Sequence, residues 1–261
     1  MPSETSPVLL GREGAIAFLT LNRPAAMNAL DIPAAEAFLA ACKSLAADDT
    51  VRVVVLRGAG RAFGVGGDLA VLQHDSQRTA DVLIGCLHEA VLLLAGMNAP
   101  VIASLHGVVA GGSLSLSMAC DLAIAAEGTR FNLAYANVAA NCDVSGSWSL
   151  PRLVGLRRAM QIALLSETFD AAEALSLGIV NRVVPAADLE EETLALATRL
   201  ASGPTLAYGR MKRLMRQSFE NDLPTQLDAE RDNFKAGTQT ADFHEALQAF
   251  LAKRPPVFQG R

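Results

Sequence analysis

The chain has 261 residues, of which 51% are apolar, and its formal net charge at pH 7 is −5. This length suits one large domain with a sizeable core, and the acidic balance argues against a basic surface for nucleic acid. No uninterrupted apolar run reaches the ~18 residues that cross a bilayer, so we expect no membrane partner.

The N-terminus and the potential metal ligands narrow the class of protein. Residues 1–14 lack the cationic segment and apolar stretch of a secretion signal. The cysteines show no CxxC spacing, and the histidines show no HExxH spacing. The four cysteines are Cys42, Cys86, Cys120 and Cys142. We therefore expect a cytoplasmic protein with reduced thiols and without a metal site.

The first half of the chain alternates predicted strands and helices. Strands are expected where apolar and β-branched residues run together, at residues 14–21, 51–58, 101–106 and 120–126. Asp31 is expected to cap a helix that runs to about residue 47, with Pro33 in its first turn. A second helix is expected over residues 79–96, where apolar side chains recur at helical spacing.

From about residue 150 the pattern becomes mostly helical. Helices are predicted at residues 152–166, 171–178, 189–202, 204–219, 224–236 and 240–252, with one short strand at 179–184. Pro185 and the Gly203-Pro204 pair separate helices and do not mark a domain boundary. We expect this last third of the chain to pack on the core or on a neighbouring subunit.

The glycine-rich loop at residues 58–67 fits no nucleotide-binding motif. A dinucleotide fingerprint would need glycine where Phe63 or Leu69 stands, and the GK[ST] ending of a phosphate loop is absent from this stretch. The loop instead offers backbone N–H groups near Gly66 and Gly67, directly after a predicted buried strand.

A second glycine pair, Gly111-Gly112, lies between the predicted strand at 101–106 and a helix-like run. The first N–H groups of a helix are unpaired and lie at the positive end of its dipole. Two such loops could each direct one N–H at a single carbonyl oxygen, which stabilises an oxyanion by ~3–4 kcal/mol per donor. A glycine pair that only permits a tight turn is the alternative.

Five stretches, in order along the chain, resemble the enoyl-CoA hydratase/isomerase (crotonase) superfamily. They are LNRPAAMNAL (21–30), RAFGVGGDL (61–69), HGVVAGGSLSLSMACDLAIA (106–125), LPRLVGLRRAMQIALLSETFDAAEALSLGIVNRVVP (150–185) and FHEALQAFLAKRPPVF (243–258). The resemblance implies an α/β fold, with a crotonase-like spiral of ββα units over residues 1–200 and a C-terminal helical trimerisation region over 201–261. It also implies a homotrimer or hexamer and no cofactor apart from the coenzyme A of a thioester substrate.

By the same resemblance, the backbone N–H groups of Gly67 and Gly112 would hold the carbonyl oxygen of the thioester. The residues expected to line the substrate channel are Ala25, Ala26, Met27, Val65, Gly66, Gly67, Asp68, Leu69, Gly111, Gly112, Ser115, Tyr135 and Cys142. The acidic net charge does not conflict with a polyanionic ligand, since a few local arginines and a helix N-terminus can hold phosphates.

The two glutamates that hydratases of this superfamily use are missing. Their positions correspond to Ser115, three residues after the second oxyanion glycine, and to Tyr135 in FNLAY. A serine and a phenol near their usual pKa values are poor general bases at pH 7. Hydration by two glutamates is therefore disfavoured.

The carboxylate that the sequence does supply is Asp143, in NCDVSGSWSLPRL. It matches an aspartate that shuttles a proton in dienoyl-CoA isomerases and in the ring-epoxide isomerase of phenylacetate breakdown. In 4-chlorobenzoyl-CoA dehalogenase, the matching aspartate attacks the aromatic ring. The alternative is that Asp143 is the N-cap of the helix that follows.

His88 and Cys142 complete the candidate residues. His88 lies twelve residues before Pro100, where the dehalogenase has a catalytic histidine, and the alternative is a helix histidine packed between Ile84 and Leu92. Cys142 is interpreted as a pocket residue, because no histidine is adjacent in sequence to activate its thiol.

Three hypotheses follow. The first is an acyl-CoA isomerase that forms an oxyanion-stabilised enolate with Asp143 as acid and base. The second is a dehalogenase-like hydrolase with Asp143 as nucleophile and His88 as base. The third is a non-catalytic acyl-CoA-binding protein, and an enoyl-CoA hydratase remains a further alternative.

Overall fold

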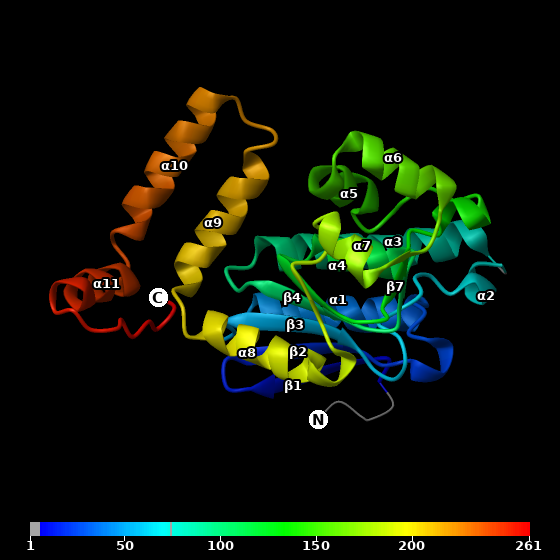
Figure 1. The fold of residues 1–261 in the computed structure, drawn as a ribbon, viewed down its shortest axis with the longest axis horizontal. Helices are drawn as coiled ribbons and strands as arrows, with labels where there is room; N and C mark the ends of the chain where they lie inside the picture. The colour runs from blue at the N-terminus through cyan, green and yellow to red at the C-terminus, as the bar shows by residue number, and fades with distance from the viewer. Residues whose placement is uncertain (1–5, 74) are drawn as a thin grey trace.

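The computed structural model describes residues 6–73 and 75–261, so the predicted absence of a secretion signal concerns residues that lie partly outside it. Two sheets organise this part of the chain (Figure 1). The six-stranded sheet has the order β1 (Val8–Glu13), β2 (Ile16–Leu21), β3 (Val53–Gly58), β4 (Val101–Leu105), β6 (Leu122–Ala126), β9 (Arg182–Val184). The three-stranded sheet has the order β5 (Val108–Ala110), β7 (Arg130–Asn132), β8 (Phe169–Asp170).

Most of the large sheet is parallel. β1 pairs with β2 in antiparallel fashion, and each later neighbour in the sheet runs parallel. Because parallel strands are covered on both faces, β3 is a continuous buried run from Val53 to Leu56. Val54 and Leu56 pack into the main core, whereas Val53 and Val55 pack on the opposite face with Ala197.

Helices cover the two faces of this sheet and surround the site. α1 (Ile32–Ala46) and α3 (Ser76–Gly96) pack along each other beside the main core, and α8 (Leu189–Ala201) covers the opposite face. The shorter helices and turns are η1 (Pro24–Ala26), α2 (Leu69–Leu72), α4 (Gly112–Ala119), η2 (Tyr135–Val138), α5 (Gly146–Val154), α6 (Leu156–Leu165), α7 (Ala171–Ser176) and η3 (Ala186–Asp188).

The last three helices extend away from the layered part of the molecule (Figure 1). They are α9 (Thr205–Gln217), α10 (Leu223–Gly237) and α11 (Ala241–Leu251). Their bounds agree with the predicted helices to within two residues. The division of the chain at residue 200 stays a prediction.

The sequence-based elements are confirmed in the large sheet, but the three short strands β5, β7 and β8 were missed, and two further predictions need correction. Asp31 caps α1 as expected, since its carboxylate accepts a hydrogen bond from Ala34 N at 2.9 Å. The single helix predicted at 152–166 is instead two helices, because Gly155 has a φ of +76° and ends α5 there. The strand predicted at 14–21 is the second arm of a hairpin whose first arm, β1, was missed.

α3 passes a length and composition test for a membrane-spanning helix, the one helix to do so in the part of the chain that the structure describes. It packs along α1, and its residues Leu83, Leu87 and Leu94 belong to the main core. The main hydrophobic core therefore accounts for the buried leucines of α3, and one such helix is weak evidence for a membrane protein.

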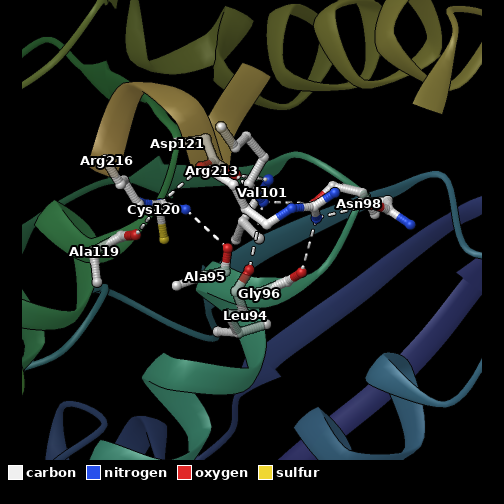
Figure 2. A network of polar contacts seen from close by, with 12 residues as sticks. Leu94, Ala95, Gly96, Asn98, Val101, Ala119, Cys120, Asp121, Arg213 and Arg216 are labelled. Carbon is white, nitrogen blue, oxygen red and sulfur yellow. Dashed lines mark hydrogen bonds and ion pairs between the residues drawn. The ribbon is translucent and has the colours of Figure 1, made fainter. Parts of the chain in front are cut away.

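Cationic side chains of α9 attach the C-terminal helices to the core (Figure 2). Lys212 Nζ donates to Ala99 O at 2.9 Å and pairs with Asp121 at 2.6 Å. Arg216 donates to Ala95 O at 2.9 Å and pairs with the other carboxylate oxygen of Asp121 at 2.8 Å. Positive charge is stabilising at the C-terminal end of α3, where the last carbonyl groups of the helix are free to accept.

We expect Asp121→Asn to lower the free energy of unfolding by about 3 kcal/mol, because it leaves two largely buried cations without their counter-charge. The side chains of Lys212 and Asp121 are only 8% and 13% exposed. Urea denaturation followed by circular dichroism measures the effect. The matched control is Asp228→Asn, which removes an exposed pair with Arg231 on α10 and should change stability by less than about 0.5 kcal/mol. Equal effects in the two variants would contradict this role for Asp121.

Candidate active site

The two glycine loops meet at one end of the large sheet. The loop after β3 pairs with β5, since Gly64 N donates to Val108 O at 3.1 Å and Ala110 N donates to Gly64 O at 2.9 Å. Ser113, fully buried at the start of α4, accepts a hydrogen bond from Gly66 N at 3.0 Å. These bonds hold the loop and the helix N-terminus as one unit.

The predicted oxyanion donors remain free to bind a ligand. Within residues 6–73 and 75–261, neither the Gly67 N–H nor the Gly112 N–H has a protein acceptor. Gly66, in the first loop, has a φ of +88°, and a Cβ placed there would be 2.7 Å from Gly112 N in the second loop. The close approach therefore requires glycine at this position. The structure brings both predicted donor loops together, while their role stays a prediction.

The predicted binding loop at residues 25–27 lies at the end of η1, with Met27 as its C-cap, and is joined to the same unit. Buried Asn28 donates to Ala59 O at 2.9 Å and to Ala62 O at 2.7 Å. Leu30 N donates to Gly66 O at 2.8 Å, so the segment after η1 forms a short backbone bridge with the glycine loop that follows β3. Sequence analysis did not single out Asn28, although asparagine is a common residue in turns.

Asp68 and Leu69 are two predicted substrate-binding residues in the loop after β3. Asp68 is held by protein contacts, whereas Leu69 is exposed. Asp68 pairs with Arg23 at 3.2 Å and accepts from Ala70 N as the N-cap of α2. Arg23 also pairs with Asp31 at 2.9 Å, so one arginine joins both loops to α1. Leu69 is 56% exposed at the entrance. Sequence analysis missed Arg23, because its two partners, Asp31 and Asp68, are brought together only by the fold.

A chain of three polar side chains lies beside the free amide of Gly112. Ser115 Oγ and Tyr135 Oη are 3.0 Å apart, and Tyr135 Oη donates to Asp143 Oδ1. A Cβ placed on Gly112 would lie 3.6 Å from Asp143 Oδ1 and 3.7 Å from Tyr135 Oη. The predicted site residues Gly112, Ser115, Tyr135 and Asp143 therefore converge.

Partial burial sets the charge states of this cluster. Burial raises the pKa of Asp143 above its usual range, more than the Tyr135 hydroxyl and nearby His88 lower it. Burial, followed by the charge of Asp143, raises the pKa of the Tyr135 phenol and of the Cys142 thiol. Raised pKa values keep Tyr135 and Cys142 neutral at physiological pH, which makes Asp143 the candidate for proton exchange among these three side chains.

Direct contacts exclude the N-cap alternative for Asp143 and show what His88 touches, while a catalytic role for His88 stays untested. The helix after Asp143 begins at Gly146 with Ser145 as N-cap, so the carboxylate of Asp143 does not cap it. His88 lies exposed on α3, where its Nε2 accepts a hydrogen bond from Val144 N at 3.2 Å. His88 thereby supports the backbone turn next to Asp143, at a residue, Val144, whose φ is +48°.

The arrangement combines two free amide donors with one carboxylate whose pKa is raised. Such a pair of donors polarises a carbonyl, and this acidifies the carbon next to it. A carboxylate at the same place can take and return a proton. The chemistry that this geometry allows is proton transfer beside a thioester carbonyl.

The sequence profile of the enoyl-CoA hydratase/isomerase family matches residues 11–261. The chain belongs to this family. It is therefore an enzyme of the crotonase superfamily, as the five sequence stretches predicted. The crotonase fold is confirmed by solved structures such as an enoyl-CoA hydratase of Bacillus anthracis, with a TM-score of 0.93 at 30% identity, covering 98% of this chain and 100% of that one.

Curated relatives of this crotonase differ in the reaction they carry. A probable enoyl-CoA hydratase of Rhodobacter capsulatus is 37% identical over 94% of this chain and 95% of its own. The 1,2-epoxyphenylacetyl-CoA isomerase of Escherichia coli is also 37% identical, over 95% of this chain and 97% of its own. The similarity to the ring-epoxide isomerase branch is thereby confirmed. The family accounts for an acyl-CoA hydratase or isomerase, and the choice between the two rests on the site.

Proposed function

We propose that this crotonase is an acyl-CoA isomerase that shifts a double bond through a thioester enolate. The amides of Gly67 and Gly112 stabilise the enolate oxygen, and Asp143 takes the proton from carbon and returns it to another carbon. The observation that carries the proposal is the position of the Asp143 carboxylate beside Gly112, with its Oδ1 3.6 Å from a Cβ built there. The C–H bonding electrons pass into the enolate and return when the new C–H bond forms, so no cofactor apart from coenzyme A is needed.

Hydration is disfavoured by what occupies the two glutamate positions. Ser115 and Tyr135 are hydrogen-bonded to each other, and Tyr135 also donates to Asp143. Neither side chain is a base at neutral pH, since burial raises the pKa of Tyr135 further above its usual range. Only one carboxylate is present beside Gly112 among the described residues, whereas addition of water by the hydratase route uses two.

The dehalogenase-like hydrolase is the second candidate, and the contact of His88 argues against it. A neutral imidazole has one nitrogen that accepts and one that donates. Because His88 Nε2 accepts from Val144 N, its proton is on Nδ1, and no free basic nitrogen remains to activate water. His88 is therefore proposed as a support for the Asp143 turn and not as a base.

The experiment that tests the proposal is mass spectrometry of products from 2-enoyl, 3-enoyl, dienoyl and 4-halobenzoyl thioesters of coenzyme A. An unchanged mass with a shifted double bond supports the isomerase. A gain of one water on the 2-enoyl compound would establish a hydratase, and loss of halide would establish a hydrolase. No change to any thioester would favour the acyl-CoA-binding protein.

We expect the isomerase activity to fall at acidic pH, with its midpoint above the ordinary aspartate range near 4. The reason is that burial raises the pKa of Asp143, and only the ionised form accepts a proton from substrate. The pH profile of kcat/KM measures this midpoint, because kcat/KM reports the pKa values of the free enzyme. A limb at or below pH 4 would contradict the assignment of Asp143 as base.

We also propose a trimer, or a hexamer built from trimers, that acts in the cytoplasm. The C-terminal helices carry large apolar side chains on their surface, among them Met215, Phe234 and Phe250, which are 70%, 68% and 81% exposed. A monomer in solution would leave this area in water at a cost. Light scattering on purified protein should give three or six times the 27.4 kDa chain mass, and a monomer mass would contradict the proposal.

A further inference from the structure

The direction of each hydrogen bond in the polar chain can be deduced. An ionised carboxylate only accepts, so the single proton of Tyr135 points at Asp143 Oδ1. The phenol oxygen then has to accept in its other contact, and Ser115 Oγ therefore donates to it across 3.0 Å. The protons of Ser115 and Tyr135 both point toward the carboxylate.

The surrounding residues hold these hydrogen-bonded side chains in one arrangement. Ser115 is fully buried, and Gly146 packs so closely on its hydroxyl that a Cβ there would clash. Tyr135 is anchored by the turn that precedes it, where Asn132 accepts a hydrogen bond from Ala134 N at 2.6 Å. The phenol of Tyr135 therefore reaches Asp143 from a fixed position.

The titratable groups that face Asp143 come from three elements. Tyr135 is in η2, His88 is on α3, and Cys142 precedes Asp143 in its own segment. Of these, Tyr135 is the one that donates a hydrogen bond to a carboxylate oxygen of Asp143. His88 contacts the next residue, at the backbone of Val144.

We propose that Tyr135 is a positioning residue that holds Asp143 through Oδ1, which leaves Oδ2 as the oxygen that exchanges the substrate proton. The proposal rests on the isomerase function. Oδ2 accepts the proton while the C–H electrons remain on the substrate as the enolate. Oδ1 then becomes the carbonyl oxygen of the acid and still accepts from Tyr135, so neither side chain has to move. Oδ2 then returns the proton to the second carbon.

One consequence is that both carbons must lie within reach of a single oxygen. A proton that stays on Oδ2 between the two steps moves within one substrate molecule and exchanges little with solvent. If the carboxylate could rotate, either oxygen could carry the proton and exchange would increase. Retention of a substrate deuterium in the product therefore reports on the positioning by Tyr135.

The test is Tyr135→Phe, which removes the hydroxyl and keeps the ring. The pKa of Asp143 is measured by carbon-13 NMR in protein labelled at aspartate carboxyl groups, with the signal assigned by its absence in Asp143→Asn. We expect a higher pKa of Asp143 in the variant, because the loss of a donor disfavours the ionised form. We also expect a loss of about tenfold to a hundredfold in kcat, a smaller change in KM, and less deuterium retained in the product.

Two further variants separate this effect from a general disturbance. Tyr208→Phe makes the same change at the other tyrosine of the chain, in α9, and should leave the titration and the kinetics unchanged. Ser115→Ala keeps the phenol but removes its donor, and should shift the pKa of Asp143 in the same direction by less. Thioester binding measured by calorimetry confirms that each variant folds.

The positioning role would be overturned if Tyr135→Phe and wild type had the same pKa of Asp143 and the same fraction of deuterium retained in the product. This holds whatever the activity of the variant. A failure of the proposed function looks different. In that case Asp143→Asn keeps full isomerase turnover while the NMR titration still reports whether Tyr135 acts on Asp143.

Discussion

Asp143→Asn is expected to lower kcat/KM for isomerisation by roughly 10²–10⁴-fold, the usual effect of losing the group that transfers a proton. Asparagine has nearly the same shape and can still accept from Tyr135, so the change removes the basic oxygen and little else. Steady-state kinetics on the thioester that the product survey identifies gives the ratio. Binding of that thioester should change by less than about threefold, since the amides of Gly67 and Gly112 are untouched.

The stability of Asp143→Asn provides a control with a defined sign. Because burial raises the pKa of Asp143 in the native state, the native state binds this proton more tightly than the unfolded chain does. The contribution of Asp143 to stability is therefore present at pH values below its unfolded pKa and is lost as pH rises through the higher native value. At pH 7 the asparagine variant should be at least as stable as wild type. Full turnover by this variant would show that Asp143 is not the acid and base.

Gly66→Ala is expected to lower kcat by about 10²–10³-fold, as for the loss of one oxyanion donor. The added Cβ would be 2.7 Å from Gly112 N and 3.2 Å from Ala110 O, and Gly66 has a φ of +88° that alanine adopts only under strain. The loop or the start of α4 has to move, and the two amides then no longer point at one oxygen. The measurement is kcat for the same thioester, with circular dichroism as the check of folding.

The matched control is Gly85→Ala, in the middle of α3. Nothing lies within 4 Å of a Cβ at Gly85, and its backbone is helical. Alanine is the better helix former by about 0.5–1 kcal/mol, so this variant should be slightly more stable and fully active. Equal activity of Gly66→Ala and Gly85→Ala would contradict an oxyanion site between the two loops.

Local sequence determined a large part of this molecule. The β-branched run at 51–58 predicted a buried strand, as β3 confirms, and Asp31 with Pro33 predicted the helix start that α1 shows. The two glycine-rich loops were recognisable in the sequence, and the structure explains glycine at Gly66 and Gly111, which have φ values of +88° and +53°. The superfamily followed from the order of such local motifs.

The functional contacts were decided by the tertiary structure, because they join residues that no local pattern links. Tyr135 meets Asp143 across 8 residues and Ser115 across 20, and Val144 meets His88 across 56. The positions of Ser115 and Tyr135 indicated only that two glutamates were missing. The fold added that Ser115 and Tyr135 form a hydrogen-bonded chain to the remaining carboxylate of Asp143. Its burial and its hydrogen bonds exist only once the loops and α4 pack together.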